Sequence, residues 1–332
     1  MILAAVPQMK VLRMNSMQSD EPTSSFPLED SPQHPRPPRS LFTVRYVVAA
    51  IAVVTLLIAA ILLLRSAPSL FPVRVNAQYG FMNRSGKVAI PAQFAAAKTF
   101  SQGLAPVSVN GKWGYVDSKG RLVVSPQFDV ADPFRDGLAV VGIGAQLGYI
   151  GRDGKFAINP QFTGAGSFED GLAPVLQGQN WGFIDRDGKM AIAARFTEAH
   201  SFSDGLALVR VGDRYGYADK SGKLAIQPQY VAAGDFGDGM AAVLVGTRYG
   251  YIDKSGKLVI PAQFDFAGQF SDGLARAAIQ NRFGFIDRRG KFVINPQFDR
   301  AGNFSHGLAP VWVADHQGYV DHSGRFIWNP TA

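Results

Sequence analysis

A recurring aspartate is the first side chain in this sequence that could carry out chemistry. It opens an Asp-x-x-Gly-Lys/Arg motif, and Asn83 and Gly151 replace it in two copies. A series of carboxylates could bind Ca²⁺ or act in acid catalysis, but a Ca²⁺ site needs roughly six to eight converging oxygens. One carboxylate per motif does not supply them, so we expect each aspartate to accept hydrogen bonds from the amides of its own turn. These aspartates are Asp117, Asp185, Asp219, Asp253, Asp287 and Asp321.

The histidines give no stronger indication of a catalytic or metal site. His316 and His322 flank a predicted strand, yet no third ligand follows at a spacing known for metal sites. The absence of cysteine excludes disulfides, thiolate metal sites and cysteine nucleophiles. The chain also lacks a Gly-x-Ser-x-Gly motif and a phosphate-binding glycine-rich loop. We therefore predict no catalytic residues, no metal and no cofactor.

Two recurring aromatic positions are better candidates for a functional role. The favoured interpretation of both is an internal ladder that holds one repeat to the next, because large aromatic side chains mostly fill cores. For the phenylalanine found in a loop of each repeat, such as Phe236 and Phe270, we expect burial. The second position carries Trp, Tyr or Phe, and its polar-edged rings could instead form an exposed surface that stacks on sugars or peptides. The predicted ligand-binding residues at this second position are Trp113, Trp181, Tyr215, Tyr249 and Phe283.

These side chains recur because the chain is a tandem repeat. One glycine stands in every copy, and each step between copies is 34 residues without insertion or deletion. A fixed period of this length indicates a repeat architecture. The recurring glycines are Gly80, Gly114, Gly148, Gly182, Gly216, Gly250, Gly284 and Gly318.

Each repeat has the composition of short strands joined by turns. The recurring glycine lies in an aromatic and aliphatic segment typical of a strand. The Asp-x-x-Gly motif then predicts a hairpin turn with its glycine, such as Gly222 or Gly256, at positive φ. A second strand ends near Pro-Gln-Phe, and a third follows an Asp-Gly turn. No segment of the repeat has a helical apolar period, so we predict three strands per repeat and no helix.

Residues 110–117, NGKWGYVD, resemble the opening motif of the WG repeat, also called the KWG repeat, of bacterial proteins. The resemblance extends over residues 79 to 330, because the register holds through every copy. It implies a β-rich binding or scaffolding module, and it implies no catalytic residues.

The repeats predict an all-β domain over residues 78–332, with seven units plus a partial eighth. An opening pair of strands at about 79–94 looks like a cap, which favours an open solenoid-like or superhelical array. The alternative is a closed seven-bladed β-propeller, although propeller blades usually have four strands and 34 residues is short for four. In an open array, Phe236→Ala in the middle should lower stability more than Phe304→Ala near the end.

The N-terminal part has a different character. Residues 1–46 form a Pro- and Ser-rich segment that predicts a disordered tail, and residues 65–77 a linker. Between them, residues 47–64 are an uncharged apolar run long enough to predict one transmembrane helix. The Lys/Arg balance favours a cytoplasmic N-terminus, because three arginines precede the run and two follow it.

These features together predict a single-pass protein of the inner (cytoplasmic) membrane whose repeat domain lies in the periplasm or outside the cell. The net charge of +7 includes no basic patch that would predict nucleic-acid binding. The predicted function is a non-catalytic binding or scaffolding domain for a protein, for peptidoglycan or for another envelope glycan. The alternative is an envelope-polymer hydrolase with an unrecognised active site.

Overall fold

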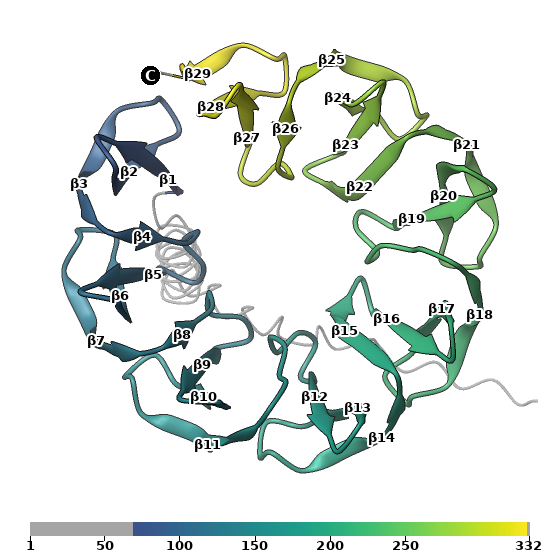
Figure 1. Ribbon diagram of the computed structural model, residues 1–332, viewed down its shortest axis with the longest axis horizontal. Coiled ribbons are helices and arrows are strands. Elements are labelled where there is room, and N and C mark those ends of the chain that lie inside the picture. Colours follow the sequence, from purple (N-terminus) through teal and green to yellow (C-terminus); the bar gives the residue numbers. More distant parts are fainter. Residues whose placement is uncertain (1–68, 331–332) are drawn as a thin grey trace, which may run out of the picture. The chain divides into compact units, whose positions relative to one another are not determined.

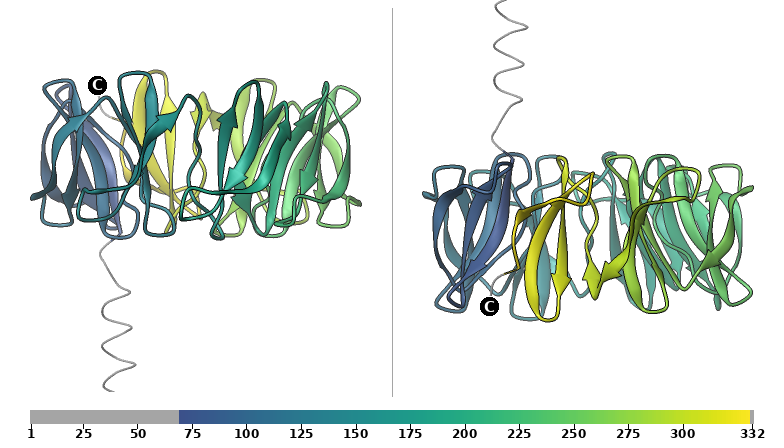
Figure 2. Two further views of the ribbon diagram at one scale, coloured as in Figure 1. Left: turned by 90° about the horizontal axis from the view of Figure 1, so that it is seen from below. Right: turned by 90° about the horizontal axis from the view of Figure 1, so that it is seen from above.

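The repeats close into a ring. The computed structural model describes residues 69–330, which form eight antiparallel sheets of three or four strands. Figure 1 shows these sheets arranged radially as the blades of an eight-bladed β-propeller, and Figure 2 shows the strands running between its two faces. The prediction of an all-β repeat fold is confirmed. The open array is wrong, and so is the alternative with seven blades.

The blades follow one another along the chain. Blade 1 contains β1 (Leu70–Val75), β2 (Gln78–Asn83) and β3 (Val88–Phe94), and blade 2 contains β4 (Ala96–Ala97), β5 (Leu104–Val109), β6 (Lys112–Asp117) and β7 (Leu122–Phe128). Blade 3 contains β8 (Val130–Ala131), β9 (Ala139–Ile143), β10 (Gln146–Ile150) and β11 (Phe156–Phe162), and blade 4 contains β12 (Ala173–Gln177), β13 (Asn180–Ile184) and β14 (Met190–Phe196). Blade 5 contains β15 (Glu198–Ser203), β16 (Leu206–Val211), β17 (Arg214–Ala218) and β18 (Leu224–Tyr230), and blade 6 contains β19 (Met240–Val245), β20 (Arg248–Asp253) and β21 (Leu258–Phe264). Blade 7 contains β22 (Phe266–Ser271), β23 (Leu274–Ile279), β24 (Arg282–Ile286) and β25 (Phe292–Phe298), and blade 8 contains β26 (Arg300–Ala301), β27 (Leu308–Val313), β28 (His316–Asp321) and β29 (Phe326–Trp328).

Most blades contain a fourth strand that the sequence did not predict. This innermost strand has two residues in blades 2, 3 and 8 and six in blades 5 and 7, and in blades 4 and 6 it is reduced to the single bridges Ala165↔Val175 and Ala233↔Val243. It lies in the segment that the sequence analysis treated as a loop. The prediction of three strands per repeat therefore missed the strand nearest the ring axis. Its two-residue copies have no alternating pattern, and the six-residue copies β15 and β22 are interrupted by a register shift.

The start of the ring was also placed too late. The linker predicted for residues 65–77 includes β1, which pairs with β2 from Leu70↔Asn83 to Val75↔Gln78. The predicted cap is thus a blade whose first described strand is β1. The predicted transmembrane helix at 47–64 and the whole predicted tail at 1–46 lie outside the described residues. Among residues 69–330, no helix is long and apolar enough to cross a membrane.

The recurring glycine marks the place where the outer strand of each blade crosses close to the third strand. A Cβ on Gly250 would lie 2.6 Å from the carbonyl oxygen of Ile260, and one on Gly114 would lie 2.4 Å from that of Val124. Real Cβ atoms do not approach backbone this closely, so only glycine fits. The pairing register of β20 with β21 shifts on both sides of Tyr251, which bends the outer strand toward the next blade.

The loop phenylalanines hold neighbouring blades together. Phe236 is fully buried, and its ring centroid lies 4.7 Å from that of Tyr217 in the preceding blade. The Tyr217 hydroxyl donates to the carbonyl of Gly234 at 2.8 Å. The expected burial of Phe236 and Phe270 is confirmed, and so is the positive φ of Gly222 and Gly256.

The closure of the ring uses a different phenylalanine. At the junction of blades 8 and 1, the Tyr319 ring contacts Phe71 of β1 at 5.7 Å, and its hydroxyl donates to the carbonyl of Pro72 at 2.8 Å. The 34-residue period places Ser66, which lies outside the described residues, where the other repeats have the loop phenylalanine. It places Phe71 where they have alanine, as at Ala105. The aromatic contact between neighbouring blades is therefore present at the closure as well, but the phenylalanine that makes it lies on strand β1 and not in a loop.

Candidate functional site

The turns between the first and second strands of the blades all lie on one face of the ring. Because neighbouring strands are antiparallel, the turns between third and fourth strands lie on the same face. The two kinds of turn meet across blade boundaries: His322 Nε2 lies 3.0 Å from the carbonyl oxygen of Asp272, and Lys220 forms an ion pair with Asp170 at 3.5 Å. We call the cavities beside these turns the mouth.

Aspartates in four of the turns join their blade to the next. Asp136, Asp204, Asp238 and Asp272 have positive φ, and each accepts a hydrogen bond from the glycine amide of the following blade's turn at 2.6 to 2.8 Å. The Asp-Gly pairs that the sequence indicated as turns therefore also join the blades.

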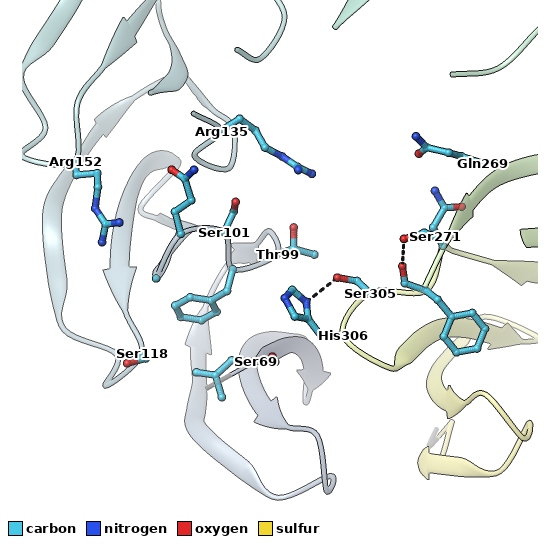
Figure 3. A pocket seen from close by; sticks show the side chains of 16 residues that line it. Ser69, Thr99, Ser101, Ser118, Arg135, Arg152, Gln269, Ser271, Ser305 and His306 are labelled. Carbon is cyan, nitrogen blue, oxygen red and sulfur yellow. Dashed lines mark hydrogen bonds between the residues drawn. The ribbon is translucent and has the colours of Figure 1, made fainter. Parts of the chain in front are cut away.

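The larger part of the mouth is a cavity of about 770 Å³, shown in Figure 3. Most of its polar lining consists of hydroxyl, amide and guanidinium groups, and no carboxylate contributes. Figure 3 shows Arg135, Thr99 and His306 around the same space, with Gln269 facing them from the side of blade 7. The lining residues are Ser69, Leu70, Thr99, Phe100, Ser101, Gln102, Gly103, Ser118, Arg135, Arg152, Gln269, Ser271, Asn303, Phe304, Ser305 and His306.

This cavity coincides with the ring closure. Its walls come from Leu70 of blade 1, from Phe100 between β4 and β5 of blade 2, and from Phe304 between β26 and β27 of blade 8. Phe100 and Phe304 contact the preceding blades in the usual way, at 4.8 Å from Phe81 and 4.7 Å from Phe285. Between them, Phe71 makes the corresponding contact from within β1. The departure from the repeat pattern and the cavity therefore occur at the same place.

Three serine hydroxyls in the mouth donate hydrogen bonds that join neighbouring blades. Ser101, Ser203 and Ser271 each donate to the carbonyl oxygen of the phenylalanine in the next loop, namely Phe134, Phe236 and Phe304, at 2.5 to 2.7 Å. A hydroxyl oxygen can also accept, and that of Ser203 already accepts from Gln269. The serines thus favour ligand groups that donate hydrogen bonds.

A second cavity of about 410 Å³ continues the mouth toward blades 4 to 6. It shares Arg135, Gln269 and Ser271 with the first cavity. Gln269 reaches across blade 6 and donates to Ser203 Oγ at 3.1 Å and to the Phe236 carbonyl at 2.7 Å. This crossing requires glycine at 237, where a Cβ would lie 2.5 Å from Cγ of Gln269.

The predicted aromatic residues lie elsewhere. Trp113, Trp181, Tyr215, Tyr249 and Phe283 each stand on the third strand of a different blade, half-buried against a core cluster. None lines either mouth cavity, and their role in ligand binding stays a prediction.

Tyr215 also belongs to a polar network near the ring axis. Its hydroxyl donates to Glu198 at 2.7 Å, and His200 lies 3.2 Å from Glu198 and 3.0 Å from Asp235 of the next blade. The hydrogen bond with Asp235 is the largest of several effects that raise the pKa of His200 from 6.5 to about 9, against the opposing effect of burial. His200 is therefore a cation between two carboxylates at neutral pH.

The aspartates of the Asp-x-x-Gly motif cap their own turns, as predicted. Asp253 Oδ1 accepts from the amides of Ser255 and Lys257 at 2.9 and 3.1 Å. The additional hydrogen bond from the Ser255 hydroxyl is the main cause that lowers the pKa of Asp253. Within the described part of the chain, no three His, Asp or Glu side chains are grouped so that they could hold a metal ion.

Sequence reasoning missed the residues of the mouth. Arg135 and Glu169 stand one residue after the loop phenylalanine, where four of the other repeats have serine. The replacement of serine at this position by Arg135, Glu169 and Gly237 was a signal in the sequence that these loops differ from the others. Its meaning depends on ring closure, which brings loops from blades 2, 3, 7 and 8 to one cavity.

Comparison with known proteins supports the repeat and the fold. The family described as WG containing repeat matches seven consecutive segments, at residues 79–113, 113–144, 148–181, 181–215, 215–246, 249–282 and 283–311. A search of curated proteins finds no match.

Solved structures show the same kind of ring. Dihydro-heme d1 dehydrogenase NirN in complex with DHE aligns with a TM-score of 0.53 at 15% identity, over 78% of this chain and 72% of that one. The structure titled as the eukaryotic initiation factor aligns with a TM-score of 0.50 at 12% identity, over 80% of this chain and 85% of that one. At such low identity these similarities concern the fold alone. The repeat matches cover well over half of the sequence, and the chain therefore belongs to the family of proteins built from WG containing repeats.

Proposed function

We propose that this propeller is a non-catalytic binding domain whose ligand enters the mouth. The observation that carries the proposal is the larger cavity, whose volume of about 770 Å³ lies in the range of ligand sites, roughly 300–1,000 Å³. Its hydroxyl, amide and guanidinium groups suit a segment of a protein or of an envelope glycan. We further propose display outside the cytoplasmic membrane, which rests on the sequence alone: the apolar run at 47–64 and the arginines that flank it.

Filling the cavity tests this proposal. Thr99 is exposed and lines the cavity, so Thr99→Trp should block it without disturbing a core. Val123→Trp, on the exposed outer strand of the same blade, is the matched control. Purified full-length chain is mixed with isolated envelope polymer and with envelope protein, and bound chain is measured after sedimentation or capture. The proposal requires that Thr99→Trp abolish binding while Val123→Trp binds like the wild type. Equal binding by both variants would place the ligand elsewhere.

A hydrolase is the second candidate, because Ser305 Oγ and His306 Nδ1 lie 2.9 Å apart in the cavity. A Ser–His pair can activate a nucleophile, but a third group usually orients the histidine. No carboxylate lines this cavity. A fluorophosphonate probe decides between the two: labelling of wild type that is lost in Ser305→Ala would favour the hydrolase, and absence of labelling favours binding alone.

A further inference from the structure

The two cavities of the mouth have opposite charges. The larger cavity is lined by Arg135 and Arg152 together with His306, and by no acidic side chain. Among residues 69–330, the smaller one is lined by four carboxylates, on Glu169, Asp204, Asp235 and Asp238, and by one cation, Arg135. Asp235 is also paired with His200, and the carboxylates remain in excess. The mouth is therefore electrostatically dipolar, with its positive end at the ring closure and its negative end at blades 4 to 6.

The two ends belong to one site because they share walls. Arg135, Gln269 and Ser271 line both cavities. Gln269 is held by its two donated hydrogen bonds, which leaves its side-chain oxygen free to accept. Arg135 stands at the boundary, where its guanidinium lies 3.8 Å from Glu169.

The carboxylates at the negative end keep capacity for a ligand. Asp204 and Asp238 each use one oxygen to accept from a glycine amide, and Asp235 uses one for His200. Within residues 69–330, the Glu169 carboxylate has only the long ion pair with Arg135. An ionised carboxylate can accept several hydrogen bonds, so a second oxygen remains on each aspartate.

We propose that the mouth binds a peptide segment that carries an anionic group at one end and a cationic group at the other. The anionic group lies against Arg152 and Arg135, and the cationic group against Glu169 and the neighbouring aspartates. Peptide amides between them donate to the serine oxygens and to Gln269. This inference rests on the proposed function, since it names the ligand class of the same cavity. The inference excludes, as the ligand, a glycan that carries no such peptide.

Titration of synthetic peptides into the purified full-length chain tests the proposal. The four probes are short Ser/Asn peptides with both charges, with the acidic group alone, with the basic group alone, and with neither. Arg152→Gln removes the cation at one end, and Glu169→Gln removes a carboxylate at the other. Neither side chain donates or accepts a hydrogen bond within residues 69–330. Arg186→Gln is the control, because Arg186 occupies the same turn position one blade later and lines neither cavity.

The doubly charged peptide should bind most tightly, and each mouth variant should weaken it by about tenfold or more. Arg152→Gln should weaken the acidic peptide and spare the basic one, and Glu169→Gln should do the reverse. Arg186→Gln should change neither. The proposal is overturned if no charged peptide binds, or if the neutral peptide binds as tightly as the doubly charged one. It is also overturned if both variants affect all peptides alike. Binding of a neutral glycan that Thr99→Trp blocks would overturn this inference and leave the proposed function intact.

Discussion

Side chains at the mouth differ in whether they form hydrogen bonds to a neighbouring blade, and those that do keep a further acceptor for a ligand. Asp238 and Ser271 join blades through hydrogen bonds to the next turn. Arg135, Arg152 and Glu169 have no such bond and face the cavities. This division is the basis for choosing residues whose loss should affect binding more than folding.

Gly237 should be intolerant of a side chain because Gln269 crosses over it. A Cβ there would lie 2.1 Å from the Phe270 carbonyl oxygen, whereas one on Gly234 would have no atom closer than 3.9 Å. We expect Gly237→Ala to lower the free energy of unfolding by about 1–3 kcal/mol, and Gly234→Ala to change it by about 0.5 kcal/mol or less. Urea unfolding of both variants is the measurement. Equal stability of the two would mean that Gln269 does not lie across residue 237.

His200 should make stability depend on pH at the alkaline side. Its pKa is raised in the folded state from 6.5 to about 9, so its favourable interactions with Asp235 and Glu198 are fully present below pH 6.5. They are lost as the pH rises through about 9. The difference in unfolding free energy between wild type and His200→Gln should therefore shrink across that interval. A difference that stays constant with pH would show that His200 is not a cation in the folded protein.

At the scale of the elements, turns and third strands could be predicted because their signals are local. The Asp-x-x-Gly motif specified a capped hairpin, and the recurring glycine specified a strand with a close neighbour. The innermost strands could not be predicted, since β4, β8 and β26 have two residues each and the longer β15 and β22 are interrupted by a register shift. Their pairing is defined by the blade that surrounds them and not by their own sequence.

Closure changes what the loop phenylalanines should contribute. Phe236 and Phe304 are buried to the same degree and have equivalent contacts, 4.7 Å from Tyr217 and from Phe285. In a ring neither is near an end, so Phe236→Ala and Phe304→Ala should each cost about 3–5 kcal/mol. This corrects the expectation from an open array that Phe304→Ala would be milder. Denaturant midpoints of the two variants decide, and a clearly milder Phe304→Ala would indicate that blade 8 frays as an end does.

At the scale of the whole molecule, the number of blades could be read from the repeats, but the closure of the ring could not. The recurring glycine occurs eight times, which equals the number of sheets. Strand β1 of blade 1 was not recognised because it lacks the turn glycine that precedes the corresponding strand of every other blade, and because it contains Phe71 in place of alanine. Contacts such as Phe71 with Tyr319 join residues from opposite ends of the domain. No periodic pattern specifies such contacts, and the mouth at the closure could not be predicted without them.

Photocrosslinking tests most directly the claim that the mouth is the binding site. A photoreactive phenylalanine analogue is placed either at Ser118, which lines the larger cavity, or at Trp113. Trp113 belongs to the aromatic column, meaning the five half-buried third-strand residues that the sequence predicted to bind a ligand. Each full-length chain is irradiated with envelope material, and adducts are identified by mass spectrometry. We predict an adduct from position 118 that disappears when Thr99→Trp is added, and none from position 113. An adduct from position 113 alone, unaffected by Thr99→Trp, would contradict the account and assign binding to the aromatic column.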